Sequence, residues 1–105
     1  MRPIPPTLRE EMANDPFYKK CVLAFMGGCG GRIEWHHVFI YAGRQLNEKW
    51  AIVPACHDHH AKAEPLREHF EHIALNRATT QELLQISKAI DYVAKRKYLN
   101  DKYSC

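Results

Sequence analysis

The chain has 105 residues, of which 46% are hydrophobic and 26% charged, a composition typical of one ordinary globular domain and a length too short for two. The formal net charge of +3 is mild and does not by itself indicate a protein that binds nucleic acid. No apolar run approaches the roughly 20 residues of a membrane-spanning helix, and the start MRPIPPTLREE lacks the apolar middle of a secretory signal. We therefore expect a soluble, cytoplasmic protein with no membrane partner.

The N-terminal part is expected to be extended, with short helical turns. Thr7 and Glu10 have the spacing of a capping box for a first short helix. Asn14 or Asp15, which precede Pro16, fits the start of a second helical turn. The whole chain is interpreted as a single domain with a leader, a core and a helical C-terminal part, at residues 1–20, 21–64 and 65–105 respectively.

The middle of the chain predicts a β-hairpin with a long connection. β-Branched and aromatic residues from Arg32 to Ile40 indicate a strand, because these side chains suit a half-buried pleated surface. NEKW has the character of a turn, and WAIVP indicates a second strand that Pro54 should end. Because a two-stranded hairpin is only marginally stable alone in water, we expect a further stabilising element.

The remainder of the chain is predicted to be helical. The stretch from about His57 to Glu64 has helical composition, and Leu66 to Leu75 restarts the helix after a proline. Thr79 and Glu82 form another capping-box pattern, at the start of a final helix. The apolar residues of that helix recur at spacings of three and four, which predicts one stripe that packs on the domain or forms a dimer seam. The stripe consists of Leu83, Ile86, Ile90 and Val93.

Cysteines close to histidines indicate a metal site, because a reducing cytoplasm disfavours disulfides. Cys21 and Cys29 precede the predicted hairpin, whereas Cys56 and His59 follow it. Four such ligands would close a tetrahedral Zn²⁺ site, whose binding energy would help to stabilise a small fold. Glycines on both sides of Cys29 would allow the loop to turn tightly around the ion. The alternative is that Cys21 and Cys56 are simply buried small hydrophobic residues.

A second group of histidines flanks the same hairpin. Consecutive residues of a helix point about 100° apart, so when His59 faces the zinc, His60 can face the hairpin. His36 and His37 lie near the end of the first strand, and Glu64, one helical turn beyond His60, could add an oxygen ligand. Adjacent strand residues point to opposite faces. The strand must therefore twist or end at the histidine pair if both are to reach one centre.

The run WHH, a following asparagine and the run CHDHHAKA resemble the HNH endonucleases, whose ββα-metal fold holds one divalent cation between a hairpin and a helix. The resemblance covers about Cys21 to Glu64. Small phage and prophage HNH proteins look most similar, with YAGRQLNEKWAIVPAC as the most characteristic run. This resemblance implies an α+β fold with a hairpin-plus-helix core, a structural zinc site and an additional C-terminal helix.

The resemblance also implies a role for each matching residue. His36 corresponds to the first ligand of the catalytic metal, His37 to the general base and His60 to the last metal-binding histidine. Asn47 corresponds to the asparagine that ties the connecting loop and holds the base; the alternative for Asn47 is a simple turn former in NEK. The paired cysteines of the family match the predicted zinc ligands, with His59 where the fourth ligand is usually cysteine.

The function implied by the resemblance is metal-dependent endonucleolytic hydrolysis of DNA. A neutral histidine would take a proton from the attacking water, and a divalent Mg²⁺, Mn²⁺, Zn²⁺ or Ni²⁺ ion would stabilise charge on the phosphate and the leaving 3′ oxygen. DNA, and phage or host DNA-processing proteins, are the expected partners. Basic residues in or beside the histidine region are the candidate DNA contacts, namely Arg32, Arg44, Lys49 and Lys62. The alternative from another class is a zinc-stabilised module that binds nucleic acid or protein without cleaving anything.

Overall fold

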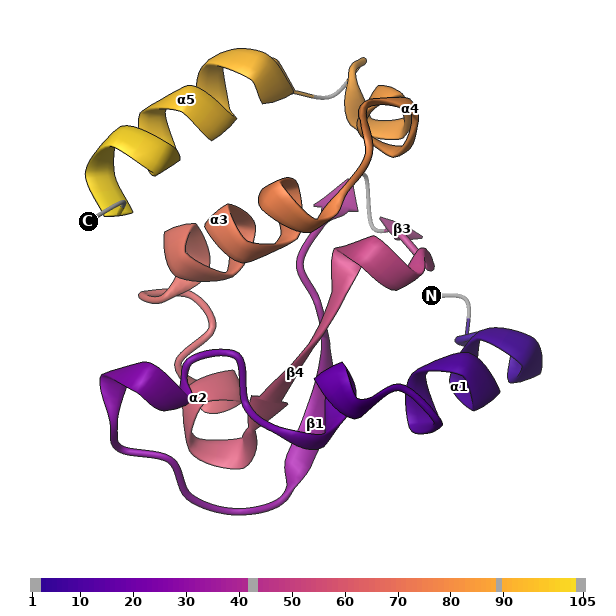
Figure 1. The fold of residues 1–105 in the computed structure, drawn as a ribbon, viewed down its shortest axis with the longest axis vertical. Helices are drawn as coiled ribbons and strands as arrows, with labels where there is room; N and C mark the ends of the chain where they lie inside the picture. The colour runs from indigo at the N-terminus through magenta and orange to yellow at the C-terminus, as the bar shows by residue number, and fades with distance from the viewer. Residues whose placement is uncertain (1–2, 42–43, 89, 104–105) are drawn as a thin grey trace.

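The chain has an α+β fold in the computed structural model, which describes residues 3–41, 44–88 and 90–103 (Figure 1). The helices and strands are, in chain order, α1 (Pro6–Ala13), β1 (Ile33–His37), β2 (Ile40–Tyr41), β3 (Arg44–Gln45), β4 (Ile52–Cys56), α2 (His57–Ala61), α3 (Arg67–Arg77), α4 (Thr80–Leu83) and α5 (Tyr92–Tyr103). Short 3₁₀ segments occupy Pro16–Lys19, Ala24–Met26, Lys49–Ala51 and Leu84–Ile86. Within the described ranges, no helix is long and apolar enough to cross a membrane.

The predicted hairpin is present as the antiparallel pair of β1 and β4, and α2 begins directly after β4 (Figure 1). The register places His37, the last residue of β1, opposite Ile52. The expectation that Pro54 ends the second strand is wrong, because Pro54 lies opposite Trp35 within β4. Each strand of a two-stranded sheet has a free edge, where the missing N–H of proline removes no ladder bond.

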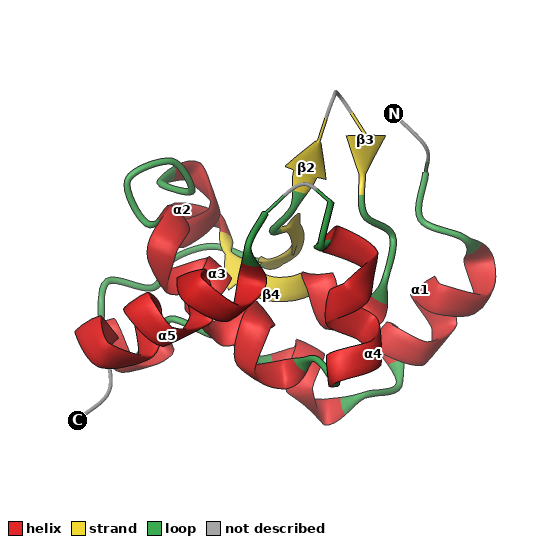
Figure 2. Ribbon diagram, turned by 90° about the horizontal axis from the view of Figure 1, so that it is seen from above, coloured by secondary structure: helices red, strands yellow, loops and turns green. Residues whose placement is uncertain are grey.

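β1 ends at His37, earlier than the predicted end at Ile40. The backbone N–H of Val38 still bonds to the carbonyl of Ala51 at 3.0 Å, but beyond it the chain leaves the β1–β4 pair. β2 and β3 then pair antiparallel as a small hairpin of their own, which stands out from the body of the molecule in Figure 2. The long connection therefore has structure of its own. The first strand ends at the histidine pair, which is one of the two ways in which the sequence analysis expected both histidines to reach one centre.

Of the two helix caps predicted in the N-terminal part, one is present in the structure. α1 begins after Pro5, which provides no side-chain cap, so the capping box predicted at Thr7 is wrong; a proline in the first turn lacks an N–H that needs a partner. The second start is confirmed. Asp15 caps the following 3₁₀ turn by accepting a hydrogen bond from the N–H of Phe17 at 2.9 Å.

After Thr79, the described residues form the two helices α4 and α5 where the sequence predicted one final helix. The capping box is confirmed, because the N–H of Glu82 bonds to Thr79 Oγ1 at 3.1 Å and the N–H of Thr79 bonds to Glu82 Oε1 at 2.9 Å. However, α4 ends at Leu83, and α5 packs separately against α3 (Figure 1). Leu83 contributes to the core, whereas Val93 is 60% exposed. The predicted stripe is therefore wrong as one helical face, because a break in the helix changes the direction of every later side chain.

The core consists of three adjoining clusters around the hairpin. The largest lies between α3, α4 and α5 and includes Trp50 and Leu75. A second contains Cys21, Cys56 and Phe70 beside β4, and a third joins the N-terminal helices to the sheet. The two clusters on β4 leave that strand buried at all of its positions, so the hairpin is held by packing on both faces.

Candidate functional site

The four predicted zinc ligands come together in the structure. The Nδ1 atom of His59 lies 3.3 Å from the sulfur of Cys21, 3.6 Å from that of Cys29 and 3.3 Å from that of Cys56. All four ligand atoms lie within 4.8 Å of one another. A tetrahedral Zn²⁺ ion with ordinary bond lengths would place sulfur and nitrogen about 3.5 Å apart. The spacing of these donor atoms therefore fits a tetrahedral ion such as zinc.

Local backbone geometry brings the ligands to this point. Cys56 is the last residue of β4 and the N-cap of α2, and its sulfur accepts a hydrogen bond from the N–H of His59 at 3.4 Å. The sulfur of Cys21 accepts a similar bond from the N–H of Leu23 at 3.4 Å. On the loop before β1, Gly31 has a φ of +81°. The loop glycines therefore have the role that the sequence predicted, and the N–H bonds orient the thiolates.

The chemistry of the thiols also favours a bound cation. Although burial opposes ionisation, hydrogen bonds from the N–H groups of His59 and Gly30, with the neighbouring thiols, lower the pKa of Cys56 to about 6. Desolvation and the hydrogen bonds to Cys56 and Cys21 raise the pKa of Cys29 to about 11. Thiols this close oppose one another's ionisation, and a divalent metal ion removes the conflict because it binds thiolates.

A second group of residues surrounds a pocket of about 440 Å³ at the end of β1. His36 and His37 both line it, together with Glu64 from the segment after α2. The ring of His36 lies 5.0 Å from that of His60 and 4.6 Å from that of Phe70, measured between ring centroids. Because β1 ends at His37, two adjacent histidines reach one pocket despite the alternation of a regular strand.

Burial changes the chemistry of His36. Burial, followed by repulsion from the neighbouring imidazoles of His60 and His37, lowers the pKa of His36 to about 4. His36 is therefore neutral at physiological pH. A neutral imidazole carries the lone pair that a metal ion requires.

Glu34 orients His60 and was missed in the sequence. Oε1 of Glu34 lies 2.8 Å from Nδ1 of His60, and Oε2 lies 3.1 Å from Nδ1 of His57. Hydrogen bonds from His57 and His60 lower the pKa of Glu34 to about 2. With Nδ1–H of His60 bonded to a carboxylate, Nε2 is left as the atom that can bind a metal. The sequence does contain a signal for this role of Glu34. Glu34 and His36 are two residues apart, and residues at i and i+2 of a strand share a face.

Asn47 contacts the predicted base directly. Its Oδ1 lies 2.8 Å from Nε2 of His37, and its Nδ2 donates to the carbonyl of Pro3 at 3.2 Å. An amide oxygen accepts hydrogen bonds only, so Nε2 of His37 carries the proton and Nδ1 has the free lone pair. Asn47 thus contacts a histidine side chain, and it also ties the connecting loop to the N-terminal segment.

The two sets of predicted metal ligands differ in how closely their donor atoms lie together. Among the described residues, the Cys21, Cys29, Cys56 and His59 group is the one set of three or more donors close enough for a single ion. His36 and His60 have adjacent rings, and Glu64 is exposed on the rim of the pocket. The histidine pocket is thus only partly organised as a metal site.

The predicted DNA-contacting cations lie in different surroundings. Arg32 and Lys62 are exposed, and Arg32 lies 3.5 Å from Glu34. Lys49 pairs with Asp15 at 2.8 Å, on the N-terminal side of the molecule. Arg44 belongs to β3, and its side chain is outside the described part of the structure. Arg67 and Lys95 line the histidine pocket but were missed, because both follow the predicted core in the sequence.

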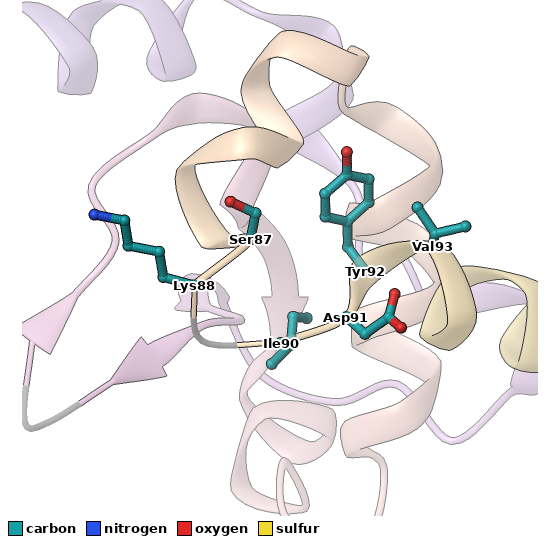
Figure 3. A pocket seen from close by; sticks show the side chains of 6 residues that line it. All are labelled: Ser87, Lys88, Ile90, Asp91, Tyr92 and Val93. Carbon is teal, nitrogen blue, oxygen red and sulfur yellow. The ribbon is translucent and has the colours of Figure 1, made fainter.

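Another depression, near the end of α4 and the start of α5, has none of this chemistry. Figure 3 shows the side chains that line it, which are Ser87, Lys88, Ile90, Asp91, Tyr92 and Val93. The hydroxyl of Ser87 donates to the carbonyl of Leu84 at 2.9 Å, and Asp91 accepts from the N–H of Ala94 at 3.1 Å. Ser87 thus bonds to the end of the 3₁₀ segment and Asp91 to the first turn of α5. We assign no function to this depression.

Comparison of the chain with family models, with curated proteins and with solved structures finds no match.

Proposed function

We propose that this protein is a metal-dependent endonuclease that hydrolyses DNA phosphodiester bonds, with His37 as the general base. The observation that carries the proposal is the convergence of His36 and His37 in one pocket, with Asn47 bonded to His37 and His60 beside His36. The order β1, β4, α2 also agrees with the hairpin and helix implied by the HNH resemblance. A zinc-stabilised scaffold alone would have no use for this pocket.

The proton transfer follows from the contact between His37 and Asn47. Because Asn47 accepts the Nε2–H of His37, Nδ1 can take a proton from a water molecule in the pocket. His37 is half-buried and borders the pocket, where a phosphate group can reach it.

The pocket and the adjoining His60 also offer ligands for a divalent cation. Two imidazoles bound to one ion at ordinary bond lengths and at the tetrahedral angle have ring centroids about 5 Å apart, and the ring centroids of His36 and His60 are separated by 5.0 Å. His36, His60 and Glu64 would hold the ion. When bound, it would stabilise negative charge on the phosphate and the leaving oxygen. Mg²⁺, Mn²⁺, Zn²⁺ and Ni²⁺ all remain candidates for this position.

The test is a supercoiled-plasmid nicking assay with each of these ions, on the wild type and His37→Ala. We expect His37→Ala to lose about 100-fold or more of the nicking rate, since a general base contributes about 10²–10⁴-fold. The control is His69→Ala, which removes a histidine that packs on Tyr103 of α5, outside the pocket. Bound zinc is measured in all three proteins, to exclude a loss of structure as the cause.

One observation favours a second candidate, a zinc-stabilised module that binds nucleic acid or protein without cleavage. Among the described residues, His36, His60 and Glu64 are not assembled as closely as the zinc ligands. If no ion supports cleavage of plasmid, single-stranded or branched DNA while zinc stays bound, the nuclease proposal is wrong and the binding module replaces it.

A further inference from the structure

The wall of the histidine pocket formed by α3 and α5 carries a cluster of charged side chains around the buried carboxylate of Glu71. Oε2 of Glu71 lies 3.0 Å from Nζ of Lys95 and 3.9 Å from Nε of Arg67. The side chain of Glu71 is only 8% exposed, that of Lys95 is 26% exposed and that of Arg67 is 62% exposed. All three residues line the pocket that His36 and His37 also line. α5 packs alongside α3 (Figure 1), and Lys95 of α5 thereby meets Glu71 of α3 at this wall.

Stability alone is a poor explanation for this cluster. Two cations share one oxygen of Glu71, while the other oxygen, Oε1, is buried with no hydrogen-bond partner among the described residues. A buried ion pair is often no more stable than a well-packed apolar substitute, and a buried polar atom left unpaired costs free energy. Such an arrangement at a pocket wall is more typical of a functional site.

We propose that Arg67 and Lys95 bind the phosphate backbone of the DNA in the histidine pocket, and that Glu71 offsets part of their positive charge. The proposal rests on the proposed nuclease function and extends the site beyond the hairpin and α2 to the helical C-terminal part. Arg67 offers a planar, exposed guanidinium for phosphate oxygens, and Lys95 offers a point charge. Glu71 offsets one of the two positive charges, and one remains for the phosphate.

This arrangement predicts that two substitutions in the same cluster affect DNA affinity differently. Lys95→Gln removes a phosphate contact and should weaken DNA binding. Glu71→Gln removes the carboxylate that competes with phosphate for Lys95 and Arg67, so binding should stay equal or become tighter. A cluster that served stability alone would respond in the same direction to both changes, because each substitution breaks the same ion pair.

The experiment measures binding of a short fluorescein-labelled DNA duplex by fluorescence anisotropy, at several NaCl concentrations. The zinc-loaded full chain carries His37→Ala throughout, and no other divalent ion is added, so cleavage plays no part. Each phosphate contact contributes about −0.9 to the slope of log affinity against log salt. Lys95→Gln should therefore make the slope shallower by about 0.9, which is about 3.5-fold in affinity between about 50 and 200 mM salt.

Lys97→Gln is the matched control, because Lys97 is on the same helix but is 77% exposed and pairs with Asp101 at 3.1 Å. We expect the Lys97 variant to keep the wild-type slope. The double variant Glu71→Gln with Lys95→Gln leaves no unpaired buried charge, and it should bind as weakly as Lys95→Gln even where the single variant is poorly folded. Thermal unfolding and zinc content of every variant establish that the fold is retained.

The outcomes separate this inference from the nuclease proposal. An unchanged slope in both Lys95 variants, equal weakening by Lys95→Gln and Glu71→Gln, or no DNA binding at all would overturn the phosphate contacts. If binding depends on Lys95 as expected but the wild type cleaves no DNA with any ion, the phosphate contacts stand and the nuclease proposal fails. If the wild type cleaves DNA and the slope is unchanged, only the inference about Arg67 and Lys95 fails.

Discussion

A single methyl group at Gly31 should disturb the junction between the loop that carries Cys29 and α2. Gly31 has a φ of +81°, and a Cβ at this position would lie 2.6 Å from the Cβ of His57. Gly27, on the same loop, has a φ of +74°, but a Cβ there would meet nothing within 4 Å. Gly31→Ala and Gly27→Ala therefore share the cost of an unfavourable backbone and differ in the contact with α2.

The difference in free energy can be worked from these contacts. A non-glycine residue at such a positive φ costs roughly 1–3 kcal/mol. Gly27 has a ψ of 178°, a combination found almost only in glycine, and this backbone cost is the whole expected cost of Gly27→Ala. In Gly31→Ala the loop must also move away from His57, because carbon atoms are at their best separation at about 3.5–4.0 Å. That movement strains the 2.9 Å hydrogen bond from the N–H of His57 to the carbonyl of Arg32, whose net contribution is about 1 kcal/mol. We expect Gly31→Ala to cost about 2–4 kcal/mol.

The assay is urea unfolding followed by tryptophan fluorescence, with zinc at the same saturating concentration for all proteins. Gly31→Ala should have the lower midpoint at an unchanged dependence on urea, which indicates a change in stability rather than in the unfolded state. Equal destabilisation by the two substitutions, or a smaller effect of Gly31→Ala, would show that the loop does not press on α2 as described.

Two further predictions concern the histidines and the bound zinc. The imidazole of His36 should titrate near pH 4, because burial and its histidine neighbours lower its pKa. Since this folded-state pKa lies below the unfolded value of about 6.5, the unfolded chain binds more protons, and stability should fall as the pH drops from about 6.5 to 4. A titration midpoint above pH 6 for the His36 imidazole, measured by NMR, would contradict the effect of burial on its pKa. Separately, zinc at about a thousand times its dissociation constant contributes about 4 kcal/mol, so chelation should lower the melting temperature by at least about 15 °C. Chelation should have little effect on Cys56→Ser, and an equal response of wild type and variant would argue against the site.

The sequence predicted the metal centre well, because local spacing determines much of its geometry. The two residues between Cys56 and His59 span the end of a strand and the first turn of a helix, where both side chains can reach one ion. The glycines beside Cys29 indicated a tight loop, because glycine adopts backbone conformations that are unfavourable for other residues. The hairpin was predictable because β-branched and aromatic residues gather on both of its strands.

The far wall of the pocket was not predictable in the same way. Glu71 and Lys95 come from two helices, and the break between α4 and α5 decides which residues of α5 meet α3. The sequence predicted an uninterrupted helix there, since the apolar spacing continues to Val93. Packing of Leu83 into the core and the separate docking of α5 are tertiary effects, which override a local periodic pattern.

The Cys/His cluster and the histidine pocket are linked through α2. This helix spans only His57–Ala61, far shorter than an isolated helix needs for stability in water. Its direction is therefore fixed by its contacts, of which His59 in the buried Cys/His cluster and His60 against Glu34 are the main polar ones. These adjacent residues point about 100° apart, so an ion that holds the first also sets the direction of the second. Loss of zinc should accordingly displace His60 from His36, and with it a ligand of the proposed catalytic ion, even where the β1–β4 pair survives.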